Sequence, residues 1–274
     1  MPRFVIGASL KAYFGRERTM TWSRAIDDLC RTHPAVRAGA VEPFAIPGFL
    51  SIAEVSALAA GGPLRIGAQN VFWDDGAYTG EVSPRQLAEF GVSLVEVGHA
   101  ERRRLFGETD EDVARKVDAI LAAGLTPLVC VGEETEGAPA EAAQAVLRQL
   151  EASIGPALAA GRSGRVIVAY EPVWAIGAAE PAGDGHIREV CRALRETLRR
   201  PGLADDSAVL YGGSAGPGLI ARIADAADGL FLGRFAHDPA AFARILDEAG
   251  SLAQARADPV PGEHGGDADE RSTW

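Results

Sequence analysis

Residues 125–131 (LTPLVCV) and 166–170 (VIVAY) are continuous apolar runs without the polar alternation of a half-exposed strand. Strands of this kind are typical of parallel sheets, in which both faces of the strand are covered. Further short runs rich in β-branched and apolar residues occur before and after them, at 4–9, 38–42, 64–68, 92–97, 208–211 and 229–232. The sequence therefore predicts eight strands of a buried parallel sheet.

Longer stretches with helical periodicity lie between and after these strands, most clearly at 17–32, 110–123, 140–160, 186–199 and 238–249. In 186–199 the apolar residues recur at the spacing of one helix face. Eight alternating units in one chain of 274 residues predict either a closed (β/α)8 barrel or an open doubly wound sheet. The nucleotide-binding open sheet is disfavoured because no G-x-G-x-x-G follows the first strand and no Walker-type loop occurs.

Residues 251–274 (SLAQARADPVPGEHGGDADERSTW) differ in character from the rest of the chain. They are rich in Gly, Pro, Asp and Glu, a composition that does not bury enough apolar surface to fold. We therefore expect a single α/β domain over residues 1–250 and a flexible acidic tail over 251–274.

The formal net charge is −11, and no apolar run reaches the 18 residues of a membrane span. Nucleic acids and anionic membranes reward clustered Lys and Arg, so the acidic balance argues against both as partners. The N-terminal sequence lacks the apolar core and cleavage site of a secretory signal, which predicts a cytoplasmic protein. Cys30, Cys130 and Cys191 are odd in number and widely spaced, so we expect buried thiols rather than disulfides or a zinc site.

Polar and glycine-rich groups follow several of the predicted strands. Lys11 lies just beyond the first strand, His99 follows the fourth and Glu171 follows the sixth. The turns 210–218 (LYGGSAGPG) and 230–238 (LFLGRFAHD) offer backbone N–H groups at helix starts, which suit a phosphate. Since the active site of such a barrel collects at the carboxyl ends of the strands, we expect these groups to share one site.

Several of these segments together resemble the triosephosphate isomerase family, in the same order along the chain up to about residue 249. The segments are AYEPVWAIG at 169–177, GH-x-ERR at 98–103, YGGS at 211–214, GAQNV at 67–71 and GAYTGEVSP at 76–84. The resemblance implies a (β/α)8 TIM barrel and a sugar-phosphate isomerase. An aldolase is disfavoured because no lysine lies within an apolar strand.

The family's mechanism implies a role for three residues of this chain. Glu171 is the base that moves a proton between neighbouring carbons, and His99 polarises the carbonyl oxygen. Lys11 stabilises negative charge on the substrate and the enediolate. The resemblance also implies that this histidine is neutral when it polarises the carbonyl.

The resemblance also implies how the phosphate is bound. Residues 172–182 form a lid, and the phosphate is held by Gly177, Ser214 and the backbone of Gly233 and Arg234. Ser9 is expected beside the substrate. No metal or organic cofactor is implied. The segment 76–84 resembles the loop that docks into a second subunit, which predicts a homodimer.

The chain departs from the family pattern around the expected substrate. Ser9 stands in place of an asparagine, Ala100 in place of a serine, and Arg234 in place of the second of two glycines. The lid carries Pro181 in place of its usual T-G-K segment. Glu96 is unexpected in an apolar strand and either faces the barrel interior or is paired across strands.

These departures spare the groups that transfer protons and change the walls around them. We therefore expect isomerisation of a triose phosphate or of a four-carbon erythrulose phosphate, with Ser9 and Ala100 making room for an extra hydroxymethyl group. The alternative is a non-catalytic phosphosugar-binding protein on the same scaffold. Structural roles are expected for Glu101, as a partner of Lys11 or of a neighbouring arginine, and for the arginines at 102–104, as salt-bridge partners. Surface positions are expected for His33, His186 and His237.

Overall fold

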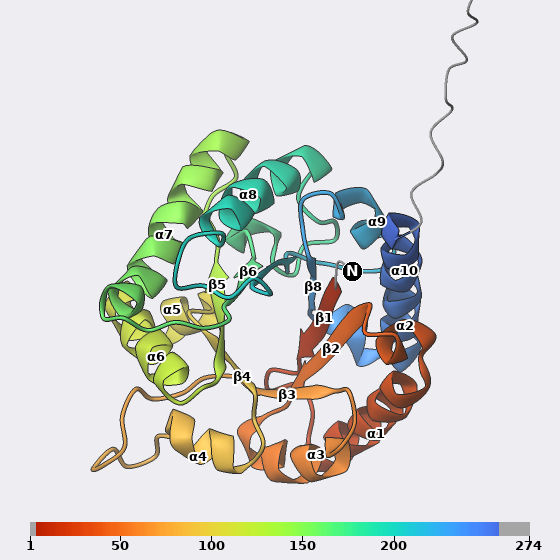
Figure 1. Cartoon of the computed structure of the whole chain (residues 1–274), viewed down its shortest axis with the longest axis horizontal. Coiled ribbons are helices and arrows are strands. Elements are labelled where there is room, and N and C mark those ends of the chain that lie inside the picture. The colour runs from red at the N-terminus through yellow and green to blue at the C-terminus, as the bar shows by residue number, and fades with distance from the viewer. Residues whose placement is uncertain (1–3, 258–274) are drawn as a thin grey trace, which may run out of the picture.

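The computed structural model describes residues 4–257 and shows eight parallel strands closed into a barrel in sequence order, with β1 paired to both β2 and β8 (Figure 1). The predicted (β/α)8 TIM barrel is confirmed. The strands are β1 (Phe4–Ser9), β2 (Val41–Ile46), β3 (Arg65–Ala68), β4 (Leu94–Val97), β5 (Thr126–Val131), β6 (Ile167–Tyr170), β7 (Ala208–Tyr211) and β8 (Gly229–Leu232).

Helices surround the barrel on its outer side (Figure 1). They are α1 (Arg16–Thr32), α2 (Pro34–Arg37), α3 (Ile52–Ala59), α4 (Pro84–Glu89), α5 (Ala100–Phe106), α6 (Asp110–Ala122), α7 (Pro139–Ala159), α8 (Asp184–Thr197), α9 (Leu219–Ile223) and α10 (Pro239–Ala257). Short 3-10 turns at Phe49–Ser51, Val173–Ala175 and Arg234–His237 lie in the connections. The stripe predicted on 186–199 is buried in α8, with Ile187, Val190, Cys191 and Leu194 inaccessible.

The apolar core is divided by the barrel wall into two clusters. One lies between the strands and the helices, and the other fills the barrel interior with residues that include Phe44, Leu94, Leu128 and Phe231. Gly7 of β1 leaves room for the Phe44 ring, because a Cβ at Gly7 would lie 2.2 Å from it. The interior is therefore packed below the carboxyl ends of the strands and leaves no pore.

Two predicted boundaries were wrong. The second strand was expected at 38–42 but runs from Val41 to Ile46, because Gly39 adopts a left-handed conformation after α2 and the strand starts later. The barrel domain was expected to end at 250, but α10 continues to Ala257 and buries Ala253. The acidic tail predicted beyond that point, 258–274, lies outside the described residues.

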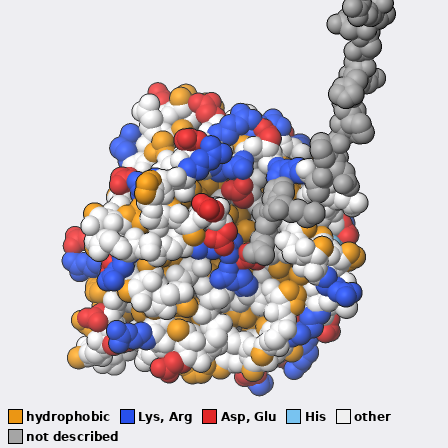
Figure 2. All heavy atoms as spheres, viewed as in Figure 1, with side chains coloured by type: hydrophobic (Ala, Val, Ile, Leu, Met, Phe, Trp, Pro, Cys, Tyr) orange, Lys and Arg blue, Asp and Glu red, His pale blue; other side chains and the backbone are white. Residues whose placement is uncertain are grey.

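The outer surface carries charges of both signs. On the face seen in Figure 2, Lys and Arg side chains are interspersed with Asp and Glu, and no extended field of one sign forms among the described residues. Within residues 4–257 no helix is long and apolar enough to cross a membrane. All three cysteines are buried as free thiols, and the described residues contain no cluster of three His, Cys, Asp or Glu side chains arranged for a metal.

Candidate active site

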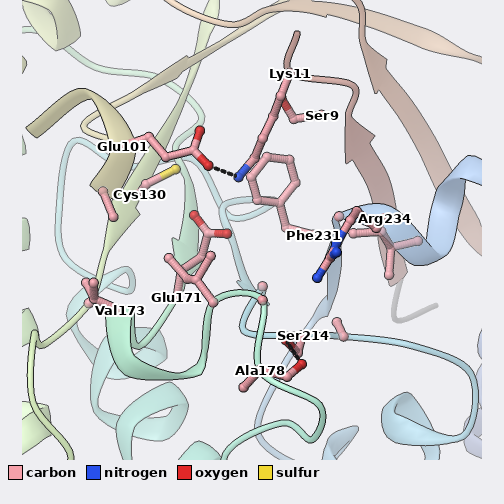
Figure 3. A pocket seen from close by; sticks show the side chains of 18 of the residues that line it. Ser9, Lys11, Glu101, Cys130, Glu171, Val173, Ala178, Ser214, Phe231 and Arg234 are labelled. Carbon is pink, nitrogen blue, oxygen red and sulfur yellow. Dashed lines mark hydrogen bonds and ion pairs between the residues drawn. The ribbon is translucent and has the colours of Figure 1, made fainter. Parts of the chain in front are cut away.

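One large cavity, of about 1200 Å³, opens at the carboxyl ends of the strands. Lys11 after β1, Glu171 after β6 and Ser214 after β7 all line it. Figure 3 shows the Lys11 ammonium and the Glu171 carboxylate pointing toward the same space, with Arg234 entering from the opposite side. Residues from both ends of the sequence therefore meet in one pocket, as the strand-end pattern predicted.

Glu171 is fixed where β6 ends, and its side chain is only 7% exposed. Its backbone N–H donates to the Val131 carbonyl, which extends the pairing with β5 by one residue. Gly212 leaves space for this side chain, because a Cβ at Gly212 would lie 2.6 Å from the Glu171 Cγ. The YGGS segment thus needs a glycine here because the carboxylate occupies the space of a side chain.

His99 caps the start of α5, and this contact sets its tautomer. The backbone N–H of Glu101 donates to His99 Nδ1 at 3.1 Å. A nitrogen that accepts a hydrogen bond carries no proton, so the imidazole in this arrangement is neutral with its proton on Nε2. That N–H faces Glu171, whose Oε2 lies 3.5 Å from Nε2.

Neither His99 Nε2 nor Glu171 Oε2 has a hydrogen-bond partner among the residues that the structure describes, although both atoms are buried. Their separation of 3.5 Å exceeds the usual range of about 2.7–3.2 Å for an N–H···O bond. Buried polar atoms are nearly always paired, so two that face each other unpaired mark a place for a ligand.

Lys11 is held in a strained backbone conformation beside this pair. Its φ is +47°, in the left-handed region that non-glycine residues seldom adopt. Its ammonium donates to Glu101 Oε1 at 2.8 Å, the pairing expected for Glu101. Burial lowers the pKa of Lys11, but the Glu101 hydrogen bond and the charges of Glu171, Glu101 and Glu96 outweigh it and raise the pKa above its ordinary value. Lys11 is therefore a fixed cation in the pocket.

The opposite side of the pocket offers groups suited to an anion. Gly177, Ser214, Gly233 and Arg234 all line the cavity. Ser214 is the other non-glycine residue with a positive φ, +53°, among those described. Arg234 starts a 3-10 turn and needs no left-handed conformation, so its replacement of glycine brings no backbone strain. Its guanidinium makes no hydrogen bond or ion pair with any residue from Phe4 to Ala257.

The predicted lid, residues 172–182, lines one side of the pocket and is hydrogen-bonded to the end of β7 and the loop after it. The backbone N–H of Ala182 donates to the Tyr211 hydroxyl at 2.9 Å. The Ser214 hydroxyl lies 2.9 Å from the carbonyl oxygens of both Ala175 and Ala178, and it can donate to one at a time (Figure 3). Pro181 lies between Ala178 and Ala182, so the altered hinge is held to the β7 end of the barrel on both sides.

A buried polar cluster under the lid was missed from the sequence. The Glu133 Oε1 atom accepts hydrogen bonds from the Trp174 indole at 2.9 Å and the Tyr170 hydroxyl at 3.1 Å. His186 Nε2 lies 3.0 Å from the same oxygen, and its side chain is 10% exposed. The surface position expected for His186 was therefore wrong, as it was for His33, which is buried and bonded to Asp247.

The floor of the pocket contains the departures noted in the sequence. Ser9 and Cys130 line it together with Phe231 from β8. Burial, followed by the charges of Glu171 and Glu96, raises the pKa of the Cys130 thiol well above its ordinary value, so it stays protonated. Below them Glu96 faces the interior and accepts a hydrogen bond from the Ser9 hydroxyl at 2.8 Å. Phe231 carried no sequence signal because it reads as one more apolar strand residue.

The arginines after His99 make the expected salt bridges in two cases. Arg103 pairs with Asp110 at 2.6 Å, and Arg102 approaches Glu108 at 3.5 Å. Arg104 instead lines the pocket.

Residues 4–249 match the model of the triosephosphate isomerase family. The chain is 47% identical over 251 residues to an L-erythrulose-1-phosphate isomerase of Pectobacterium atrosepticum, an alignment that covers 91% of this chain and 97% of that protein. It is 35% identical over 264 residues to an L-erythrulose-1-phosphate isomerase of Brucella abortus, covering 93% and 100%. A protein of the same name from Rhizobium etli is 38% identical, with 88% and 90% covered.

Proposed function

We propose that this chain, which belongs to the triosephosphate isomerase family and is a sugar-phosphate isomerase, acts on L-erythrulose 1-phosphate and converts one ketose phosphate into another. The relatives of that name support the substrate, and the altered pocket floor is consistent with it. The observation that carries the catalytic assignment is the buried, unpartnered pair of His99 Nε2 and Glu171 Oε2 beside the Lys11 ammonium.

In this mechanism Glu171 removes the proton from C3 of the substrate, next to the C2 carbonyl. The N–H of His99 and the ammonium of Lys11 stabilise the negative charge that develops on the carbonyl oxygen, which is the largest electrostatic contribution expected in such a site. The oxygen at C2 takes up a proton and the hydroxyl at C3 gives one up, a transfer between neighbouring oxygens that the neutral imidazole of His99 can carry. Glu171 then returns its own proton to C2, and the carbonyl ends at C3. The product is a ketose phosphate, because C3 still carries the C4 hydroxymethyl group.

The proposed phosphate site consists of the backbone at Gly177 and Gly233, the Ser214 hydroxyl and the Arg234 guanidinium. The lid over residues 172–182 would exclude water from the enediolate and prevent loss of the phosphate. A phosphosugar-binding protein without activity is not favoured, because pure binding gains little from a buried general base whose Oε2 is left without a hydrogen bond among the described residues.

A panel of C3 to C5 sugar phosphates tests this function, with Glu171→Ala as the control. We expect turnover of L-erythrulose 1-phosphate, and incorporation of deuterium from solvent at the reacting carbon, which requires a working base. Activity that persists in Glu171→Ala would contradict the assigned base. Triose phosphate turnover with no activity on erythrulose phosphates would refute the substrate.

A homodimer is proposed on the exposed apolar residues around the 76–84 segment and α5. Tyr78 is 41% exposed, Leu105 63% and Phe106 69%, and large apolar side chains left exposed on these two segments suit an interface between subunits. Light scattering on the purified protein tests it, since a monomer at micromolar concentration would exclude a stable dimer. The cytoplasmic location stays a prediction from the N-terminal sequence.

A further inference from the structure

Glu96 is a charged residue on the inner face of β4. Its neighbour Leu94 belongs to the interior cluster, whereas Val95 and Val97 belong to the cluster outside the barrel, so the alternation of the strand directs Glu96 inward. The carboxylate accepts the Ser9 hydroxyl at 2.8 Å. Because β1 and β4 are not neighbours in the barrel, this hydrogen bond crosses the interior directly below Lys11 and His99.

Nothing in the fold requires a carboxyl group at this place. Glu96 is 3% exposed, and no basic side chain from Phe4 to Ala257 hydrogen-bonds to it. Burial, helped by the negative charge of Glu171, raises the pKa of Glu96 to about 7 against the Ser9 hydrogen bond and the charge of Lys11. An apolar residue would pack here at lower cost, so the carboxyl group is explained better by the pocket above it than by stability.

The hydrogen bond fixes the direction of the Ser9 hydroxyl. Its proton points down to Glu96, which leaves the oxygen lone pairs directed away from that carboxylate. Ser9 lines the pocket, so these lone pairs are available to a hydrogen-bond donor on the substrate. Without Glu96 the hydroxyl would rotate freely and present no fixed acceptor.

The positions of the proposed phosphate site and of Glu171 and His99 indicate which part of the substrate lies beside Ser9. The phosphate groups proposed above follow β6, β7 and β8, and the reacting carbons lie between Glu171 and His99. A chain running from the phosphate past these residues ends on the side of β1, β4 and β5, where Ser9 and Cys130 form the wall. Ala100 adds no hydroxyl on that side. A triose phosphate ends before this wall, whereas a tetrulose phosphate carries one more hydroxymethyl group.

We propose that Ser9 and Glu96 form the subsite for the terminal hydroxymethyl group of the ketose phosphate. The substrate hydroxyl donates to Ser9 Oγ, and Glu96 is a positioning residue that orients Ser9 from below. The inference rests on the proposed function and adds the residues that distinguish a four-carbon from a three-carbon substrate.

The test compares kcat/KM for L-erythrulose 1-phosphate and dihydroxyacetone phosphate in wild type and three variants. Ser9→Ala and Glu96→Leu should each lose about tenfold on the tetrulose phosphate, the value of one lost hydrogen bond near 1.4 kcal/mol, and less than about threefold on the triose phosphate. Glu96→Gln keeps an acceptor for Ser9 and should retain most of the preference. Leu94→Ala, one layer deeper on the same strand, is the matched control and should lower the thermal midpoint without changing the ratio.

Two results would overturn the proposal, and they are distinguishable. Equal losses on both substrates in Ser9→Ala and Glu96→Leu would make the pair structural, while leaving the erythrulose phosphate assignment intact. A wild-type enzyme that isomerises only dihydroxyacetone phosphate would remove the proposed substrate and the subsite with it. If Glu96→Leu does not fold, Ser9→Ala and Glu96→Gln decide the question by the same ratio.

Discussion

The two ends of the barrel each bury a glutamate, and the protein treats them in opposite ways. At the amino ends of the strands Glu42 accepts hydrogen bonds from Arg65 and Arg165, both at 2.6 Å. Burial alone would raise the pKa of Glu42, but these two guanidinium groups lower it to about 2. At the carboxyl ends Glu96 has a serine in place of the arginines, and its pKa rises to about 7.

The same contrast extends to the groups around each glutamate. At the amino ends of the strands, here called the lower end, Glu42 is paired with two arginines. At the carboxyl ends, the upper end, His99 Nε2 and Glu171 Oε2 are buried without a hydrogen-bond partner among the described residues. The non-glycine residues with positive φ among those described, Lys11 and Ser214, are also at the upper end. In barrels of this class the lower face contributes stability and the upper face carries the chemistry. Glu42 and Glu96 show this division between a stabilising face and a chemical face within a single residue type.

The largest effect is expected from removing the charge of Glu171. Glu171→Gln keeps the shape of the side chain but not the base, so kcat should fall by about 10²–10⁴-fold, the contribution of general base catalysis. The unfolding free energy should change little, because the amide keeps the shape of the side chain and removes a buried carboxylate whose Oε2 makes no hydrogen bond within residues 4–257. Steady-state kinetics and urea unfolding check both. A loss of stability without a loss of kcat would place Glu171 with the structural carboxylates of the lower end.

The contributions of Glu96 and Glu42 to the free energy of unfolding should depend on pH in opposite ways. Glu96 binds its proton more tightly folded than unfolded, so its contribution to stability falls as pH rises from about 4.5 to about 7. Glu42 releases its proton more readily when folded, so its contribution is present above about 4.5 and is lost as pH falls toward 2. Each difference of about 2.5 pKa units corresponds to at most about 3.4 kcal/mol of unfolding free energy.

Urea unfolding of Glu96→Gln and Glu42→Gln against wild type measures these dependences. Glu96→Gln should gain stability relative to wild type between pH 5 and pH 8. Glu42→Gln should be less stable than wild type at pH 5, and the gap should narrow toward pH 3. If the unfolding free energies of the two variants, each taken relative to wild type, changed with pH in the same direction, the predicted difference between the two ends of the barrel would be wrong.

A smaller effect is expected from opening one ion pair at the lower end. Arg165→Met removes one of the two guanidinium groups that contact Glu42 within residues 4–257, together with the contacts of Arg165 with Asp206, and should cost about 1.5–3 kcal/mol, the value of a charged hydrogen bond. The kcat/KM should be unchanged, because the carboxyl ends of the strands are not touched. Thermal unfolding and the isomerase assay together check this. An Arg165→Met enzyme with normal stability and weakened turnover would contradict the division between the ends.

The eight strands were predictable because parallel strands covered on both faces produce apolar runs that stand out from the helices between them. The second strand was misplaced because Glu42 and Pro43 interrupt its apolar run. Glu42 can be buried because Arg65 and Arg165, which lie far from it in the sequence, donate hydrogen bonds to it. A buried ion pair between distant residues leaves no local pattern to read.

The meeting of Lys11, His99 and Glu171 was predictable because each follows a strand and strand ends meet at one rim. The tautomer of His99 was not, since it depends on the backbone N–H of Glu101 at the start of α5. A surface position was expected for His186 because it lies at the start of the helix predicted over 186–199. Its contacts with Glu133 after β5 and with Tyr170 in β6 join α8 to two other elements and arise only in the folded barrel.

The smallest effect is expected at Arg234, a pocket cation without a hydrogen bond or ion pair to residues 4–257, whereas Arg65 and Arg165 at the amino ends of the strands pair with Glu42. Arg234→Gly restores the glycine that the family carries and should raise KM for the phosphorylated substrate about tenfold, since a charged hydrogen bond to phosphate is worth near 1.4 kcal/mol or more. The salt dependence of KM should weaken as well, because a solvent-exposed charge is screened. Arg199→Ala removes one exposed positive charge elsewhere and is the matched control for net charge. If both variants raise KM equally, the phosphate responds to the overall charge of the protein, and the free guanidinium at the rim is not part of its binding site.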